Sequence, residues 1–390
     1  MIQQAALRRR SLASRAVGQG SPVRRMDGLM MLAIAALAVI GTLLVWSSTR
    51  SWMSVQPTGM AKKHVLNILI GLALFLAVAM MDYRRLQTAA PGIFIAALIG
   101  LLLVITPLGA TINGHHSWIA LGGGFAVQPA ELAKPALVLI LARCLVKPAE
   151  KTGRPRLASV ALCLGATGIT AALVMLEPDL GTTMVLLVIT GGVLVLAGVR
   201  KRWIMVFLLL GGATAAAVWS LGLLKPYQVA RFTALINPAS DPRGVGYNST
   251  QALVAIGSGE IFGKGLFHGG QTTGRFVPEQ HTDFIFTVAG EELGFLGSVT
   301  VVLLLGVVLL RAVRIARQCD DRFGALVAGG IVCWFAFQSF VNVGMTIGIM
   351  PITGIPLPFV SYGGTAMFAN MMAVGMLQAI RIRGYGRRAA

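Results

Sequence analysis

The chain is built from apolar runs of about twenty residues that alternate with short polar and basic segments. A helix needs about 20 apolar residues to cross the hydrocarbon core of a bilayer, which makes each run a candidate membrane span. On this criterion we predict ten spans, at residues 29–47, 64–81, 91–108, 129–146, 157–176, 180–199, 203–223, 283–310, 323–348 and 365–380. The sequence therefore predicts an all-α membrane protein with ten transmembrane helices.

The composition agrees with this prediction. Charged residues make up 12% of the 390 residues, about half the share of a typical soluble domain. The apolar run after residues 1–26 is too long for the core of a signal peptide, so we expect an uncleaved first span. The four cysteines show neither CxxC nor metal-ligand spacing, and we expect no disulfide framework.

The net charge of +19 raises the question of a nucleic-acid partner, so the position of the basic residues matters. If the N-terminus is cytoplasmic, the basic clusters all fall on the cytoplasmic side, as the positive-inside rule requires. The clusters are residues 8–10 with Arg15, Arg24 and Arg25; Arg84 and Arg85; residues 143–156; Arg200, Lys201 and Arg202; residues 311–322; and residues 381–388. The charge is thus a signal of topology, and we expect no nucleic-acid partner.

This topology places both termini in the cytoplasm and a large extracytoplasmic loop between the seventh and eighth helices. We divide the chain into a basic cytoplasmic N-terminal segment (1–26), a single ten-helix transmembrane domain (27–381) and a basic cytoplasmic tail (382–390). The extracytoplasmic loop covers residues 224–282 and is rich in glycine, proline and polar residues. We expect this loop to be partly helical.

The acidic residues are distributed just as unevenly as the basic ones. Nine of the 14 lie in the outer half of a predicted span or in an outer loop: Glu131, Glu177, Asp179, Asp241, Glu260, Glu279, Asp283, Glu291 and Glu292. Ionisable groups within or at the edge of a membrane span are costly, so each is a candidate functional group. A polar chamber open to the outer face is the simplest arrangement that would hydrate them.

Asp283 differs from the other acids in its position. It lies at the start of the eighth span, directly after a polar loop. Partial desolvation there raises the pKa of a carboxylate, which can then act as a base. Glu291 and Glu292 lie about 12–13 Å deeper along the helix. For those two residues we prefer structural hydrogen bonding between helices.

Other polar segments each allow two interpretations. Glu131 and Lys134 are three residues apart and can pair on one helix face, either to lock the helix end or to contact a substrate. Asp179 either caps the next helix or contacts substrate. Lys264 lies in a glycine-rich segment that holds phosphate or simply forms turns. The proline- and glycine-rich residues 342–364 predict a non-helical, re-entrant wall of the same chamber.

Five segments resemble the signatures of the SEDS family (shape, elongation, division and sporulation). They are residues 128–134, 177–182, 241–247, 278–286 and 356–364. The most specific are His-Thr-Asp-Phe-Ile-Phe at 281–286 and Pro-Leu-Pro-Phe-Val-Ser-Tyr-Gly-Gly at 356–364. The resemblance runs from the first span to the last, in order. Residues 263–272 are more similar to the elongation branch (RodA-like) than to the division branch (FtsW-like).

The resemblance implies a peptidoglycan glycosyltransferase of the bacterial inner membrane, with its active site facing the periplasm. It would polymerise lipid II into glycan strands during cell elongation and shape maintenance. It would work with a class B penicillin-binding protein, a transpeptidase, and with other membrane proteins of the elongation complex. In the family the aspartate matching Asp283 is essential, and the residues matching Glu131, Lys134 and Asp179 line the same cavity. We also predict substrate contacts from Gln251, Lys264, Glu279, His281, Ser361 and Tyr362.

On this basis we hypothesise that Asp283 deprotonates the 4-hydroxyl of the acceptor, which attacks the anomeric carbon of the donor. Undecaprenyl pyrophosphate then leaves with inversion. Lys134 would stabilise it, together with a divalent cation, Mg²⁺ or Mn²⁺, for which Asp283 and Asp179 are candidate ligands. We expect no organic cofactor.

A lipid II flippase is the alternative function, because a hydrated chamber with broken backbone also suits transport. The intramembrane charges cluster in the outer half and no inverted repeat is visible, which favours one-sided chemistry over alternating access. A non-catalytic scaffold would leave the acids of the chamber unexplained.

Four positions depart from the family pattern. Ala130 and Thr365 stand where serine is usual, and Glu260 stands where glycine is usual. Ser117 stands where many members have arginine. This last change removes a cation beside the cavity, and His116 is the candidate substitute.

Overall fold

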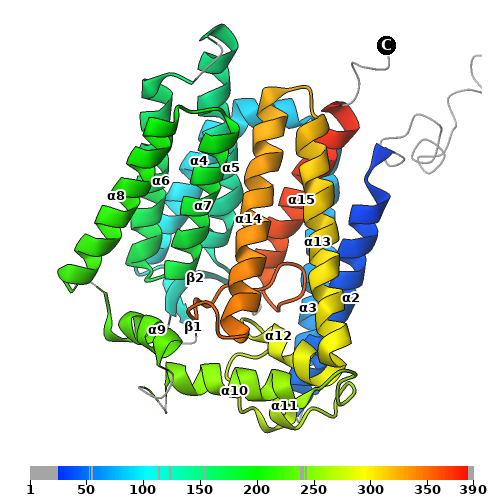
Figure 1. The fold of residues 1–390 in the computed structure, drawn as a ribbon. Coiled ribbons are helices and arrows are strands. Elements are labelled where there is room, and N and C mark those ends of the chain that lie inside the picture. The colour runs from blue at the N-terminus through cyan, green and yellow to red at the C-terminus, as the bar shows by residue number, and fades with distance from the viewer. Residues whose placement is uncertain are drawn as a thin grey trace, which may run out of the picture.

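Helices make up most of the structure, a computed structural model that describes residues 25–384 apart from 52, 54–55, 113–114, 123–124, 153–154, 223, 238–240 and 242–243 (Figure 1). The long helices are α2 (Gly28–Arg50), α3 (Gly59–Met80), α4 (Tyr83–Ile105), α5 (Pro129–Thr152), α6 (Leu157–Leu176), α7 (Leu180–Leu196), α8 (Lys201–Ser220), α13 (Gly294–Gln318), α14 (Arg322–Thr346) and α15 (Gly364–Gly384). The short ones are α9 (Pro226–Ile236), α10 (Val245–Ser258), α11 (Gly270–Gly274) and α12 (Ile285–Val288), and a π-helical turn, η4 (Ala289–Leu293), joins α12 to α13. The predicted basic segments 1–26 and 382–390 lie mostly outside the described residues.

Every predicted span contains a helix, but not every such helix is a clear membrane span. Among the described residues, eight helices are long and apolar enough to cross a bilayer: α2, α3, α4, α6, α8, α14, α15 and the continuous stretch Ile285–Gln318. Helix α7 is apolar but has only 17 residues. Helix α5 is long, but it carries Glu131, Lys134 and Arg143 within its apolar run. The chain is a multi-pass membrane protein.

Aspartates define where four of the long helices begin. In each case the side chain accepts a hydrogen bond from a backbone N–H of the first turn, which would otherwise lack a partner. The capping residues are Asp27 on α2, Asp82 on α4, Asp179 on α7 and Asp321 on α14. Asp179 is therefore a helix cap, one of the two interpretations that its sequence context allowed.

A small sheet departs from the all-α prediction. Strands β1 (Gly109–Ile112), β2 (His115–Gly122) and β3 (Phe125–Val127) pair antiparallel in the order β1-β2-β3. The segment combines β-branched and aromatic residues with glycines and is too short between its turns to form a helix. This segment lies between the predicted spans 91–108 and 129–146, and the apolar-run criterion does not detect its strands.

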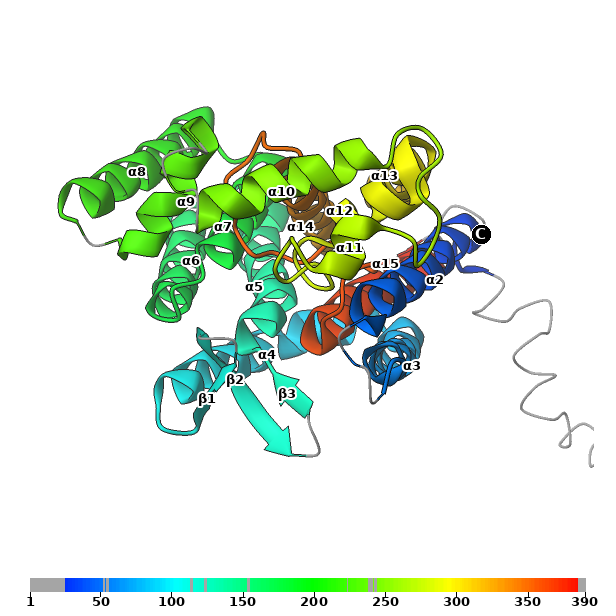
Figure 2. The ribbon, with the colours of Figure 1, turned by 90° about the horizontal axis from the view of Figure 1, so that it is seen from below.

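The two ends of the bundle differ. Figure 1 shows the sheet and helices α9–α11 at one end, whereas the red end of α15 lies at the other. Viewed along the bundle, α10 crosses this end from the α9 side toward α13 (Figure 2). The loop 224–282 is thus partly helical, as predicted. All the helix junctions that carry basic clusters lie at the opposite end.

An irregular segment enters the bundle between α14 and α15. Residues 351–357 have no regular secondary structure and most are buried, which confirms a non-helical segment within the predicted range 342–364. The prediction was wrong for residues 342–346, which form the last turn of α14. A Cβ at Gly41 of α2 would lie 2.5 Å from the carbonyl oxygen of Val360, so only glycine allows this close approach. Gly41 is nine residues from the end of α2, so the segment reaches about 14 Å along that helix.

A buried carboxylate joins three helices at the other end of the bundle. Asp27 is 1% exposed and accepts hydrogen bonds from Arg311 Nε at 3.0 and 2.8 Å and from Arg381 Nη1. Its backbone N–H donates to Gln378 Oε1 at 2.8 Å. The start of α2 is thereby fixed to α13 and to the end of α15.

We expect Asp27→Asn to lower the free energy of unfolding by about 2–4 kcal/mol, because two partly buried arginines would lose their counter-charge. Asparagine can still cap α2, so the change isolates the ionic contribution. Thermal unfolding of the purified protein in detergent measures it. Asp82→Asn is the matched control, since Asp82 caps α4 without forming a salt bridge within the described residues. Equal destabilisation by both changes would contradict the stabilising role of the ion pairs between Asp27 and the two arginines.

Candidate active site

Asp283 lines a cavity of about 250 Å³ at the end of the bundle that carries α9–α11. The walls come from segments far apart in the sequence: the sheet, the α6–α7 turn, α9, the turn before α12 and the irregular segment before α15. The lining residues are Ser117, Trp118, Gln128, Pro178, Asp179, Arg231, Glu279, Thr282, Asp283, Thr353, Gly354, Pro356, Tyr362, Gly363 and Ala366. The cavity therefore brings together four predicted site residues, namely Asp179, Glu279, Asp283 and Tyr362.

A tight turn presents Asp283 to this cavity. The carbonyl of Glu279 accepts hydrogen bonds from the N–H groups of Thr282 at 3.1 Å and Phe284 at 3.3 Å. Glu279 itself has a φ of 50°, a left-handed conformation that bends the chain sharply before α12. Thr282 Oγ1 donates to the same carbonyl at 3.0 Å. The turn is fixed by its own backbone and side chains.

Helix α14 holds this turn against the irregular segment. The side-chain amide of Asn342 donates to the carbonyl of Asp283 at 2.8 Å and to that of Ile355 at 2.7 Å. The N–H of Tyr362 donates to the carbonyl of His281 at 3.0 Å. A Cβ at Gly354, whose φ is 77°, would lie 3.3 Å from Asp283 Oδ2. The carboxylate of Asp283 therefore faces the irregular segment at Gly354, a residue without a side chain.

The surroundings of Asp283 favour its neutral form. Burial and the nearby negative charge of Glu279 raise the pKa of Asp283 to about 7, although Arg231 opposes this shift. A carboxylate with a pKa near the working pH can both accept and release a proton. Such shifts mark candidate catalytic acids and bases when they occur in a cleft.

Glu131 and Lys134 lie behind the cavity and do not line it. Lys134 is fully buried, and its Nζ contacts Glu131 Oε1 at 2.5 Å and Gln338 Oε1 at 3.2 Å. Gln338 in turn donates to the carbonyl of Pro356 at 2.8 Å. The pair therefore connects α5 to α14 and to the irregular segment. The spacing allowed two interpretations of this pair, and its geometry fits the structural one, in which the pair locks the helix end.

Glu177 and Asp179 flank the turn between α6 and α7. Asp179 Oδ1 accepts the N–H of Thr182 at 2.8 Å while the residue also lines the cavity, so it combines a cap with a position in the site. Glu177 is 2% exposed, and neither of its carboxylate oxygens has a hydrogen-bond partner among the described residues. Burial and the charge of Asp179 raise the pKa of Glu177 to about 8, so it is mostly neutral at pH 7.

The remaining predicted residues of the Pro356–Gly364 motif divide between the cavity and its support. The Tyr362 ring lies between two imidazoles, with centroid distances of 5.7 Å to His281 and 6.0 Å to His64. Burial lowers the pKa of His281 and favours its neutral form. Ser361 Oγ accepts the N–H of Leu357 at 2.8 Å and so holds the motif in shape.

Besides Glu131, Lys134, His281 and Ser361, two further predicted substrate contacts are absent from the cavity lining, namely Gln251 and Lys264. Gln251 is half-buried on α10. Lys264 lies 3.3 Å from Glu291 Oε1. Glu291 also accepts from the N–H groups of Gln271 and Thr272, both at 2.8 Å.

The other glutamate of the π-helical turn is also structural. Glu292 Oε1 accepts from Ser47 Oγ of α2 at 2.5 Å. Together with the contacts of Glu291, this confirms the interpretation of both glutamates as structural hydrogen-bonding groups.

The sequence analysis did not single out Arg231, the one cation that lines this cavity in the described part of the chain. Its Nη1 donates to the carbonyl of Thr353 at 3.3 Å, and its guanidinium lies 5.5 Å from the centre of the Tyr227 ring. The signal available was the four-residue spacing of Tyr227 and Arg231, which places them on one face of a helix. Ser117, where many relatives in the SEDS family have arginine, lines the same cavity.

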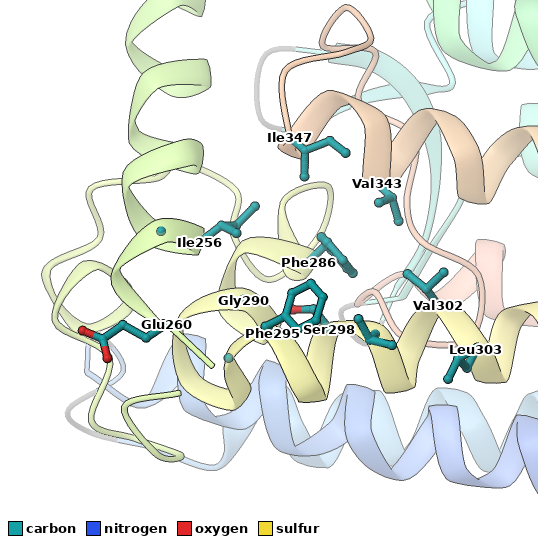
Figure 3. A pocket seen from close by; sticks show the side chains of 13 residues that line it. Ile256, Glu260, Phe286, Gly290, Phe295, Ser298, Val302, Leu303, Val343 and Ile347 are labelled. Atoms are coloured by element: carbon teal, nitrogen blue, oxygen red, sulfur yellow. The ribbon is translucent and has the colours of Figure 1, made fainter. Parts of the chain in front are cut away.

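A second, apolar cavity of about 400 Å³ lies between α10, η4, α13 and α14 (Figure 3). Figure 3 shows Phe286, Phe295 and Val302 around it, with the carboxylate of Glu260 at its rim. Glu260, at the rim, is the one titratable residue among those that line it, and the remaining lining residues are apolar apart from Ser298. The chemistry is therefore assigned to the Asp283 cavity.

No cluster of three or more His, Cys, Asp or Glu side chains with metal-binding geometry occurs in the described ranges. Asp179, Glu279 and Asp283 nevertheless line one cavity. Mg²⁺ commonly uses one or two carboxylates and completes its shell with substrate phosphates and water. These three carboxylates are therefore the candidate ligands in this cavity for such a cation.

Comparison with known proteins agrees with this geometry. The chain is 36% identical over 355 residues to the peptidoglycan glycosyltransferase MrdB of Escherichia coli K12, which covers 91% of this chain and 93% of the relative. It resembles a chain of a solved peptidoglycan synthase complex, described as coordinating polymerization and crosslinking, with a TM-score of 0.77 and 30% identity over 93% of this chain and 99% of that one.

The crystal structure of the rod shape determining protein RodA of Thermus thermophilus matches with a TM-score of 0.67 and 27% identity, over 92% of this chain and 98% of RodA. The family model FTSW_RODA_SPOVE, described as a cell cycle protein, matches residues 28–385, which is nearly the whole chain. The chain belongs to the FtsW/RodA/SpoVE family.

Proposed function

We propose that the chain is a peptidoglycan glycosyltransferase that polymerises lipid II into glycan strands during cell elongation. The observation that carries the proposal is the Asp283 carboxylate, whose pKa of about 7 suits a general base, in a cavity that also holds Arg231. The relatives named as peptidoglycan glycosyltransferase and RodA support the substrate class.

The reaction joins two lipid-linked sugars. Asp283 takes the proton of the acceptor 4-hydroxyl, and the oxygen attacks the anomeric carbon of the donor. The bond from that carbon to the diphosphate breaks, and undecaprenyl pyrophosphate leaves with the electron pair while the carbon inverts. Glu279 holds the pKa of Asp283 high, and Tyr362 and Asp179 form the walls against which the sugars lie.

A divalent cation, Mg²⁺ or Mn²⁺, would enter with the diphosphate and offset its charge. Asp179 and Asp283 are the candidate ligands because both line the cavity. The chemistry that this chain supplies is the proton transfer at Asp283 and the positioning of the two sugars.

The proposal includes a topology and a partner. All ten predicted helices would cross the inner membrane, with both termini cytoplasmic, loop 224–282 in the periplasm and residues 27–381 as one domain. The sheet, α9–α11 and the Asp283 cavity lie at the same end of the bundle. This arrangement supports a single functional face at that end. A class B penicillin-binding protein would crosslink the strands, in line with the synthase complex that the chain resembles.

We expect Asp283→Asn to abolish glycan polymerisation, with a fall of at least about 10²-fold, because a missing general base typically costs 10²–10⁴ in rate. The assay supplies labelled lipid II in detergent to the purified protein with its partner. Asp320→Asn, the same change at an exposed residue of the opposite end, should keep wild-type activity. The wild-type rate should fall as pH drops through about 7, where Asp283 becomes protonated.

Glu279→Gln removes a negative charge beside Asp283 and should move this pH midpoint downward. Full activity of the Asp283→Asn protein, at equal protein levels, would contradict the base assignment. Detergent removes the distinction between leaflets, so glycan ladders cannot arise from a flippase. An active preparation that forms no ladder but transfers lipid II between leaflets of vesicles would favour the flippase instead.

The topology predicts opposite labelling of two engineered thiols. In a protein whose four native cysteines are replaced, Thr233→Cys on α9 should react with a membrane-impermeant maleimide added to spheroplasts. Arg317→Cys near the end of α13 should react only after lysis. Both wild-type side chains are exposed, so burial does not explain a failure to react. Labelling of Arg317→Cys in intact spheroplasts would reverse the proposed orientation.

A further inference from the structure

A third cavity, of about 410 Å³, adjoins the Asp283 cavity and shares Pro178 and Arg231 with it. Its polar lining consists of His116, Glu177, Lys225, Tyr227 and Arg231. None of the steps derived above uses this space. Its position beside the reacting cavity and its composition together indicate the ligand that it would take.

The cavity is cationic. Lys225 and Arg231 both line it, and neither forms a salt bridge within the residues that the structure describes. Glu177 is the one acid among the lining residues, and its raised pKa makes it mostly neutral at pH 7. Neither cation therefore has an ionised counter-charge among the residues that line this recess, and Arg231 also borders the acids of the Asp283 cavity. A mobile anion is the group that such a recess stabilises.

Arg231 is held at the wall between the two cavities. Its guanidinium donates to the carbonyl of Thr353 and lies over the ring of Tyr227. Tyr227 is tied in turn to the carbonyl of Pro178, with its hydroxyl donating over 3.4 Å. A planar guanidinium with five N–H donors matches the oxygens of phosphate, and holding it in place reduces the entropy lost on binding. Thr111 orients His116 on the far side of the cavity, at 3.1 Å.

We propose that this third cavity is the subsite for the diphosphate of the lipid-linked donor, with Arg231 nearest the sugar and Lys225 at the outer phosphate. The inference rests on the proposed function. An inverting displacement places the attacking and leaving groups on opposite faces of the anomeric carbon. Asp283 lies in one cavity, the free cations lie in the next, and Arg231 borders both. The negative charge that develops on the departing diphosphate thus meets a fixed cation.

Two other groups gain a role from this assignment. The neutral carboxyl of Glu177, whose oxygens have no hydrogen-bond partner among the described residues, can donate its proton to a phosphate oxygen. Lys134, the cation expected from the sequence to stabilise the leaving group, is fully buried and paired with Glu131. We therefore assign the stabilisation of the leaving diphosphate to Arg231 and Lys225 instead of Lys134.

The test measures lipid binding to the full-length protein in detergent by native mass spectrometry. The probes are undecaprenyl pyrophosphate, undecaprenyl phosphate and phosphatidylglycerol, which separate a diphosphate site from a general phospholipid site. Arg231→Gln and Lys225→Gln should each raise the Kd for undecaprenyl pyrophosphate about tenfold, the size expected for losing one charge-assisted contact. Arg231→Lys should restore part of the affinity. The control is Lys63→Gln, at an exposed lysine near the start of α3 that should leave binding unchanged.

Asp283→Asn separates this inference from the proposed function. It should abolish polymerisation yet bind undecaprenyl pyrophosphate as the wild type does in buffer with EDTA, where no divalent cation links Asp283 to the diphosphate. Unchanged affinity in both Arg231→Gln and Lys225→Gln would overturn the subsite and leave the base assignment intact. Equal losses for phosphatidylglycerol would also overturn it, in favour of a phospholipid site. Lys225 is exposed, so its variant should fold normally and decides the matter even if Arg231→Gln unfolds.

Discussion

The side-chain amide of Asn342 is the interaction on which the site depends, because it donates to the carbonyls of both Asp283 and Ile355. A bundle in a bilayer tolerates irregular backbone only where protein or trapped water satisfies its polar groups. Gln338, four residues earlier and thus on the same face of α14, does the same for Pro356. One face of one helix therefore holds an irregular segment deep in an apolar bundle. Without these amides the turn that carries Asp283 would not be held against the irregular segment.

The same buried network sets the electrostatics of the site. Lys134 contacts Gln338 and forms a salt bridge with Glu131 behind the cavity, whereas Asp179 and Glu279 line the cavity together with Asp283. Glu279 and Asp179 both disfavour the charged form of Asp283, and Arg231 favours it. In a region of low dielectric these contributions are large relative to their values in water. The base is adjusted by neighbours that come from four separate segments of the chain.

Local patterns in the sequence were sufficient to predict some of these features and insufficient to predict others. Apolar runs predict helices because helix length and hydropathy are properties of consecutive residues, and every predicted span contains a helix. The strands at 109–127 were missed, since their segment lacks a regular apolar alternation. Asp283 was found because its acid lies at the start of an apolar run. Arg231 was missed and Lys134 was placed in the cavity, because burial of a cation depends on packing between distant helices.

Ser117 stands where the SEDS resemblance leads one to expect arginine, and Arg231 supplies a cation to the same cavity. Ser117 lies in the wall of the Asp283 cavity, and the arginine that many relatives carry there would add a charge to the same space. Arg231 enters that space from α9, on the other side of Pro178, and is fixed by Thr353 and Tyr227. A cation at the boundary of two cavities serves the leaving group, whereas one inside the Asp283 cavity would also lower the pKa of the base. Placing the positive charge at the boundary keeps Asp283 basic enough to accept a proton near neutral pH.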